Sequence, residues 1–187
     1  LTATDGSGAT DTQALTVTVT DANDSPVFSS ATATGSVAEN ATTSTQIFDA
    51  NSTDEDSGDT LTYTVSGTDA DLVNIDSSTG VVTLKSSANF EAKTSYSFNV
   101  LASDSTSSAT QAVTVSVTNV NEAPTVTSST SGTVAENAAT STVIYTASAS
   151  DVDSGDTINY SVSGTDSSLL NIDTATGDVT LKTSANY

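Results

Sequence analysis

The chain has 187 residues, with 23 acidic and 3 basic side chains, a formal net charge of −20, and neither histidine nor cysteine. A polyanion of this kind repels nucleic acid and anionic membrane surfaces, so neither is expected as a partner. Without cysteine the chain can form neither disulfides nor thiolate metal sites. No apolar run is long enough to span a bilayer.

Short segments in which apolar and polar residues alternate predict β-strands along the whole chain. The first is "ALTVTVT" at 14–20, where Leu15, Val17 and Val19 share one face. Similar segments follow at 60–67, 96–104 and 112–118. No segment keeps a helical period over three turns. Threonine-rich strands separated by Gly, Asp and Ser turns predict an all-β sandwich or barrel.

The sequence also repeats itself. "SVAEN" at 36–40 recurs as "TVAEN" at 133–137, and the segment 63–90 recurs at 160–187 with few changes. The repeat is about one hundred residues long, which is the size of one sandwich domain and too long for a solenoid coil. The sequence therefore predicts tandem domains.

The only two prolines, Pro26 and Pro124, each close an acidic hexapeptide, "DANDSP" or "NVNEAP". We take these hexapeptides as linkers. The predicted organisation is the C-terminal strands of a truncated repeat (1–20), a linker (21–26), a complete repeat (27–118), a second linker (119–124) and a repeat that lacks its last two strands (125–187). Because residues 1–20 resemble that missing part, we expect a segment cut out of phase with its domains; complementation between molecules is the alternative.

Two acidic loops stand out, "DEDSGDT" at 54–60 and "DVDSGDT" at 151–157. An EF-hand loop requires Gly at its sixth position and Glu at its twelfth, between helices. Counted from Asp54, the glycine is one place early, at Gly58, and the twelfth residue is Val65. The loops are therefore not EF-hands.

Each repeat also carries a glutamate in "AEN", Glu39 in the first and Glu136 in the second. The complete repeat adds Asn89 and Glu91 in "NFE" and Asp104 in "ASD". With the loops and the "DANDS" linker, these motifs resemble the cadherin repeat in its bacterial form, in the family's order. The resemblance implies tandem Greek-key β-sandwich domains of the immunoglobulin-like, cadherin-like kind, joined by short calcium-binding linkers. The calcium ions would lie between successive domains, held by acids from distant positions.

Carried over by position, the resemblance implies two ligand sets. The set at the 119–124 linker comprises Glu39, Asn89, Glu91, Val120, Asn121, Glu122, Asp151 and Asp153. The set at the 21–26 linker comprises Asn23, Asp24, Asp54, Asp56 and Asp104. Carboxylate, amide and carbonyl oxygens suit Ca²⁺, whereas zinc and copper prefer His or Cys. Mg²⁺ is an alternative, but its strict octahedron suits a site gathered from two domains poorly.

The function implied is a calcium-rigidified structural or adhesive spacer in a bacterial cell-surface or secreted protein, so the expected location is extracellular or the cell surface. Partners would be calcium, neighbouring repeats or copies of the chain itself. The alternative is a calcium-dependent carbohydrate-binding module that recognises polysaccharide. Against this, Tyr63, Tyr96, Phe98 and Tyr160 fall in phase with apolar strand faces and are expected in the core.

An enzyme is not expected, because without His or Cys the common nucleophile–base pairs are missing. The acids could instead serve only to keep the protein soluble. We expect that surface role for scattered acids such as Asp69, Asp71 and Asp166, and a turn-forming role for Asp76 and Asp173.

Overall fold

The computed structural model describes residues 1–186. Its regular elements are strands and two short 3₁₀ helices, at Ala70–Leu72 and Ser167–Leu169. The predicted all-β class is confirmed. Among the described residues, no helix has the length and apolar character needed to cross a membrane. Tyr187, the last residue of the predicted partial repeat, lies outside the described range.

Internal contacts group the chain into two units, which are described separately. The first comprises 1–35, 43–86 and 96–115, and the second comprises 36–42, 87–95 and 116–187. The second unit thus holds the "AEN" and "NFE" segments together with the linker at 119–124. These segments are far apart in sequence, so their grouping shows that the fold brings them together.

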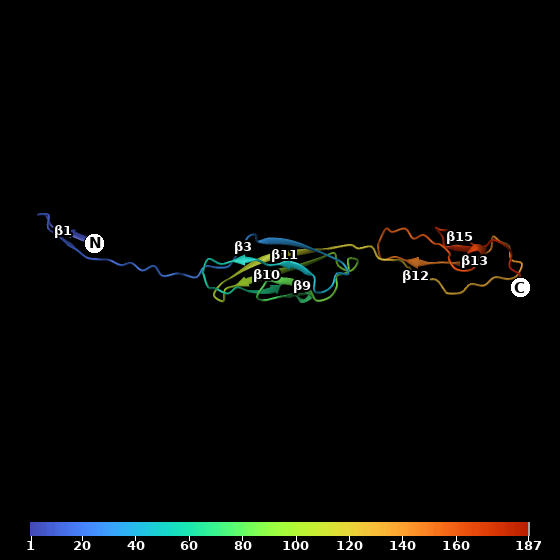
Figure 1. The fold of residues 1–187 in the computed structure, drawn as a ribbon, viewed down its shortest axis with the longest axis horizontal. Helices are drawn as coiled ribbons and strands as arrows, with labels where there is room; N and C mark the ends of the chain where they lie inside the picture. Colours follow the sequence, from blue (N-terminus) through green and yellow to red (C-terminus); the bar gives the residue numbers. More distant parts are fainter. Residues whose placement is uncertain (187) are drawn as a thin grey trace. The chain divides into compact units, whose positions relative to one another are not determined.

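Residues 27–118 form nine strands (Figure 1). They are β3 (Val27–Phe28), β4 (Thr32–Ala38), β5 (Gln46–Asp49), β6 (Ser52–Thr53), β7 (Thr62–Ser66), β8 (Val73–Ile75), β9 (Val81–Leu84), β10 (Ser95–Ser103) and β11 (Ser108–Thr118). One sheet has the order β4-β11-β10-β7, a second has the order β5-β9-β8, and β3 pairs with β6. The strands predicted within 60–67, 96–104 and 112–118 are therefore confirmed as β7, β10 and β11.

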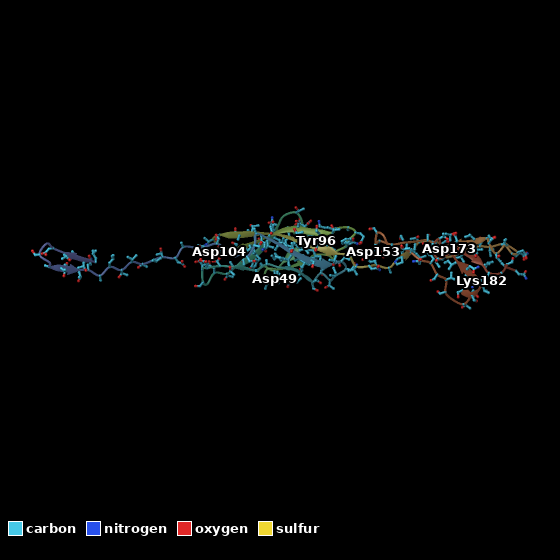
Figure 2. All side chains as sticks on the ribbon, turned by 90° about the horizontal axis from the view of Figure 1, so that it is seen from above. Asp49, Tyr96, Asp104, Asp153, Asp173 and Lys182 are labelled. Atoms are coloured by element: carbon cyan, nitrogen blue, oxygen red, sulfur yellow. The ribbon has the colours of Figure 1, made fainter. Side chains whose placement is uncertain are left out.

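The alternation along β11 explains why it is a central strand. Val113, Val115 and Val117 are 1%, 0% and 4% exposed, whereas the residues between them face solvent. Burying one such side chain contributes about 1.5–3 kcal/mol. The aromatic residues predicted for this core, Tyr63, Tyr96 and Phe98, are buried as well, which confirms that prediction. Figure 2 labels Tyr96 within the body of this domain.

Residues 125–186 form a smaller set of strands (Figure 1). They are β12 (Thr125–Val126), β13 (Val143–Thr146), β14 (Ala149–Ser150), β15 (Leu170–Ile172) and β16 (Asp178–Leu181). β12 pairs with β14, and the other three have the order β13-β16-β15. These pairings repeat β3–β6 and β5-β9-β8. Residues 129–135 and 159–163, which correspond to β4 and β7, belong to no strand, and Tyr160 is only half-buried.

The N-terminal segment forms a hairpin of β1 (Thr2–Thr4) and β2 (Thr10–Thr12), which pair in antiparallel register. The strand predicted at 14–20 is wrong, because residues 13–26 form no strand. Leu15, Val17 and Val19 are 73%, 75% and 88% exposed. A strand needs a neighbour for its backbone and an apolar surface for its side chains. The described structure gives this segment neither.

One turn aspartate in each repeat, and Asp69 in the complete repeat, have structural roles. Asp76 Oδ1 accepts hydrogen bonds from the N–H groups of Ser78 and Thr79, both at 2.9 Å, and these bonds lower the pKa of Asp76. Asp173 does the same in the second copy, so the turn-forming prediction is confirmed. In contrast, the surface role expected for Asp69 is wrong. Its side chain is 6% exposed, and its Oδ2 accepts a hydrogen bond from Ser97 N at 2.7 Å.

Candidate metal centres

The first candidate centre is built around the buried carboxylate of Glu39. All the residues of this centre belong to the second unit. Glu39 follows β4 directly and is 2% exposed. Its Oε2 accepts a hydrogen bond from Phe90 N, and its Oε1 accepts one from Val120 N, both at 2.9 Å. A carboxylate is costly to bury unless hydrogen bonds compensate the lost water. These two bonds fix the side chain between the "NFE" segment and the linker.

Three more acids surround Glu39. Carboxylate oxygens of Glu39, Glu91 and Glu122 lie within 4.8 Å of one another. Glu122 N donates a hydrogen bond to Asp153 Oδ2 at 2.7 Å, which adds the loop at 151–157. We call Glu39, Glu91, Glu122 and Asp153 the Glu39 cluster. It joins four separate segments of sequence within one unit.

The Glu39 cluster holds more negative charge than its own hydrogen bonds satisfy. Glu122 Oε1 accepts from Asn40 Nδ2 at 2.5 Å, but Glu122 Oε2 and Asp153 Oδ1 are buried and have no hydrogen-bond partner. A backbone hydrogen bond lowers the pKa of Glu91, but burial and the charges of its three neighbours in the cluster outweigh it and raise that pKa. A buried, unpaired carboxylate oxygen costs about 1–3 kcal/mol or more. A cation would relieve both this cost and the mutual repulsion.

The second centre lies in the first unit, at the loop 54–60. Carboxylate oxygens of Asp54, Asp56 and Asp59 lie within 4.8 Å of one another, and we call these residues the Asp54 cluster. Asp56 N donates to Asp54 Oδ1 at 3.0 Å, and Asp24 N of the linker donates to Asp56 Oδ2 at 2.7 Å. Asp54 Oδ2 is buried without a hydrogen-bond partner. It is the third such carboxylate oxygen in the described part of the chain.

The sequence reasoning gave no role to Asp59. Its pKa is raised, first by partial burial and then by the charges of Asp56, Asp54 and Asp104. Its position in "DEDSGDT" was the available signal, because a third acid lies three residues after the second. The matching Asp156 of the other loop is exposed and belongs to neither cluster.

Asp104 lies at the end of the complete repeat near the 21–26 linker (Figure 2). It is 5% exposed, and its Oδ1 accepts from Thr106 N and Ser107 N, both at 2.6 Å. Its Oδ2 accepts from Ser107 Oγ at 2.7 Å and Asn23 Nδ2 at 3.1 Å. The backbone and side chain of Ser107, then Asn23 and Thr106, hold the pKa of Asp104 well below its usual range. Asp104 thereby ties the linker to the turn after β10.

The remaining predicted ligands lie beside the clusters. Asn89 Oδ1 accepts from Ala92 N at 2.7 Å, Asn121 Nδ2 donates to the Glu122 carbonyl at 2.9 Å, and Asp151 Oδ1 accepts from Asp153 N at 3.0 Å. These bonds order the loops around the acids. Ligand roles for all thirteen residues stay predictions.

The two centres are built alike. In each loop the second aspartate donates its N–H to the first at 3.0 Å, and a linker residue donates its N–H to the second aspartate at 2.7 Å. The atoms of both clusters that could coordinate a metal are carboxylate oxygens, with carbonyl and amide oxygens nearby. This set suits a hard cation that takes several oxygen ligands, such as Ca²⁺. The residues present therefore fit the ion that the sequence implied.

Known proteins of similar sequence contain cadherin repeats. Residues 33–118 match the Cadherin domain family. Protocadherin Fat 4 from human is 45% identical over 91 residues, which are 47% of this chain, and its mouse counterpart is 42% identical over 107 residues, or 54% of this chain. The matches span only 2% of either relative's length.

Solved structures give the same fold. A crystal structure of mouse cadherin-23 EC22–24 has a TM-score of 0.66 and 29% identity, over 88% of this chain and 56% of that one. Human protocadherin-24 EC1–2 has a TM-score of 0.67 and 24% identity, over 82% of this chain and 75% of that one, and supports the fold alone. Residues 33–118 are therefore similar in sequence to the Cadherin domain, and the chain is similar in fold to cadherin repeats.

Proposed function

We propose that this chain is a calcium-stiffened spacer of an extracellular adhesive protein, with ions held at the Glu39 and Asp54 clusters. The observation that supports it best is the set of three buried carboxylate oxygens without a hydrogen-bond partner, on Asp54, Glu122 and Asp153. Each belongs to a cluster of three or more acids. Cadherin domains generally bind calcium, and the oxygen donors fit that ion.

Glu39, Glu91, Glu122 and Asp153 would hold calcium at one joint, with Asp151, Asn121 and Asn89 in supporting positions. Asp54, Asp56 and Asp59 would hold it at the other, next to the linker residues Asn23 and Asp24 and the turn residue Asp104. The bound ion supplies positive charge and several coordination positions for oxygen. The chain's own residues do the rest: linker N–H groups orient the loop aspartates, and Glu39 fixes the linker to the domain end.

The mechanical role follows from charge. When the carboxylates of a cluster are not neutralised, they repel one another and favour separation of the segments that carry them. Calcium removes this repulsion and holds linker and loop together. Extracellular calcium modules bind in the range of about 10⁻⁴–10⁻³ M. Sites of that affinity fill outside cells and empty in a chelator.

The location and source belong to the same proposal. The adhesive, extracellular character of cadherin repeats supports a cell-surface or secreted parent protein. The bacterial source implied by the sequence resemblance stays a prediction, since the matched relatives come from human and mouse. We propose a structural rather than an enzymatic role.

The carbohydrate-binding alternative has less support. A sugar platform needs exposed aromatic faces, but Tyr63, Tyr96 and Phe98 are 7%, 6% and 3% exposed. Reproducible calcium-dependent hits on a glycan array would promote this alternative over the spacer.

Small-angle scattering of the 187-residue chain tests the spacer directly. We expect the radius of gyration to rise with millimolar calcium and to fall with chelator, because the joints stiffen. Calorimetric titration should show heat of calcium binding. We expect Asp153→Ala to weaken the calcium affinity by about tenfold. Asp156→Ala is the matched control, since Asp156 is an exposed acid of the same loop outside the cluster. An identical scattering profile in both conditions would rule the proposal out.

A further inference from the structure

Asn40 follows Glu39 directly, and its side chain contacts the linker at 119–124. Its Nδ2 donates a hydrogen bond to Glu122 Oε1 at 2.5 Å, across 82 residues of sequence. An ionised carboxylate can only accept hydrogen bonds, so the NH₂ group of the amide faces it. Asn40 is not one of the ligands that the sequence resemblance implied, and it offers Glu122 a donor rather than a further oxygen.

This contact gives the two carboxylate oxygens of Glu122 different surroundings. Oε1 is held by Asn40, whereas Oε2 is buried and has no hydrogen-bond partner. A carboxylate oxygen of Glu122 lies within 4.8 Å of those of Glu39 and Glu91. The backbone of Glu122 is fixed as well, because its N–H donates to Asp153 Oδ2 at 2.7 Å. Glu122 is therefore held at both ends, and its unpaired oxygen is the one left for a cation.

The backbone at Asn40 places its amide beside the linker. β4 ends at Ala38, and Asn40 adopts φ +59°, in the left-handed region, so the chain turns directly after the strand. Asn40 N donates to the Ala88 carbonyl at 3.0 Å, which ties this turn to the segment that carries Glu91. Asparagine tolerates the left-handed region better than most residues. Glycine would satisfy the same backbone, but it would lack the side-chain donor.

The second "AEN" segment separates the backbone role of this asparagine from its side-chain role. Asn137 also has φ 59°, and its N–H donates to the Ala185 carbonyl at 2.8 Å. Its backbone thus repeats that of Asn40. The neighbouring Glu136 belongs to no acidic cluster in the described part of the chain. Asn137 is therefore a control that shares the turn but adjoins no clustered acid.

We infer that Asn40 is a positioning residue for calcium at the Glu39 cluster: it holds Oε1 of Glu122 and thereby leaves Oε2 to the ion. The inference rests on the proposed calcium role. Without a donor at Oε1, repulsion from Glu39 and Glu91 would favour rotamers that turn the Glu122 carboxylate away from the cluster. Holding the carboxylate before the ion binds also lowers the entropic cost of ordering this long side chain. Asn40 itself needs no bond to the metal.

Calcium titration calorimetry of the full chain tests the inference. All chains also carry Asp54→Asn, so that the Asp54 cluster contributes little to the heat. Asn40→Gly keeps the turn, because glycine adopts positive φ readily, and removes only the amide. We expect it to weaken calcium affinity by about tenfold, as is typical of residues that orient metal ligands. Asn137→Gly makes the same change in the second "AEN" segment and should stay within about twofold of the parent chain.

A double-mutant cycle with Glu122→Ala shows whether Asn40 acts through Glu122. Once the carboxylate is removed, Asn40→Gly should change metal affinity by no more than about twofold. The cycle is measured with Tb³⁺, because its higher charge strengthens the attraction to the remaining carboxylates and keeps binding detectable.

Urea unfolding in chelator separates positioning from a purely structural role. Asn40→Gly and Asn137→Gly should unfold at similar urea concentrations, because both make the same change at the same backbone conformation. A purely structural role would lower the stability of Asn40→Gly alone and leave its calcium affinity equal to that of Asn137→Gly.

Two results would overturn the inference while the calcium role stands. One is equal calcium affinity of Asn40→Gly and Asn137→Gly. The other is a loss from Asn40→Gly that persists undiminished in Glu122→Ala, since Asn40 would then act by another route. A chain with both clusters intact that binds no calcium would overturn this inference and the proposed function together.

Discussion

Glu122 N donates a hydrogen bond to Asp153 Oδ2 at 2.7 Å, across 31 residues of sequence. The same bond recurs between Asp24 N and Asp56 Oδ2, also at 2.7 Å. A linker residue thus orients the second aspartate of the "DxD" loop at both places. Each acidic loop acts together with its linker.

Removing the anchor should destabilise the protein. Glu39→Gln keeps the shape of the side chain but replaces one accepting oxygen with an NH₂ group, which faces the N–H of Phe90 or Val120. One buried hydrogen bond to a carboxylate is then lost, so we expect a decrease of about 1–3 kcal/mol in the free energy of unfolding in urea. The control is Glu136→Gln, because Glu136 is the exposed counterpart and should change by less than about 0.5 kcal/mol. Equal effects of the two would contradict the anchor role.

Calcium should stabilise the folded chain by an amount that grows with the logarithm of its concentration above the dissociation constant. At a calcium concentration a hundred times the dissociation constant, one site adds about 2.7 kcal/mol. We expect the melting temperature to rise with calcium, and Asp54→Asn to remove part of this rise. Asp71→Asn serves as control, since Asp71 is exposed and lies outside both clusters. An unaltered calcium response in Asp54→Asn would exclude Asp54 as a ligand.

The turn aspartates should contribute a pH-dependent stability. The N–H groups of Thr79 and Ser78 lower the pKa of Asp76 from its ordinary value of 3.8. A lowered folded-state pKa stabilises the folded chain above the unfolded-state pKa, and this stability is lost as the pH falls through the folded-state pKa. Asp76→Ala should therefore be less stable than the unaltered chain at neutral pH, and the difference should shrink below about pH 4. Thermal unfolding from pH 7 to pH 2 measures it; a constant difference would contradict the assignment.

Glycine is required at the turn before β9. Gly80 has φ +76°, and an added Cβ would lie against the Ala50 carbonyl. Gly80→Ala should therefore combine backbone strain with a clash and destabilise the chain by about 2–4 kcal/mol. Gly58→Ala is the matched control: φ is +118°, but no atom lies within 4 Å, so strain alone remains, at about 1–2 kcal/mol. Chemical denaturation distinguishes the two, and a smaller effect at Gly80 would contradict the clash.

Several features could be predicted from the sequence because they depend on local pattern. Alternation of apolar and polar residues specified β7, β10 and β11, since successive side chains of a strand face opposite sides. The recurrence of the "NID" turn specified the roles of Asp76 and Asp173, because an aspartate bonds to N–H groups two and three residues ahead. These signals need no distant partner.

The tertiary structure decided what depends on distant partners. The segment at 14–20 has the same alternation as β11 but forms no strand, because no neighbouring strand or apolar surface accompanies it. Asp69 is buried because Ser97 N meets its carboxylate, and Asp59 joins the cluster because its loop folds back. The sequence by itself determined which residues could bind or pair. Only the fold decided which of them meet, since hydrogen bonds and apolar burial need both partners in place.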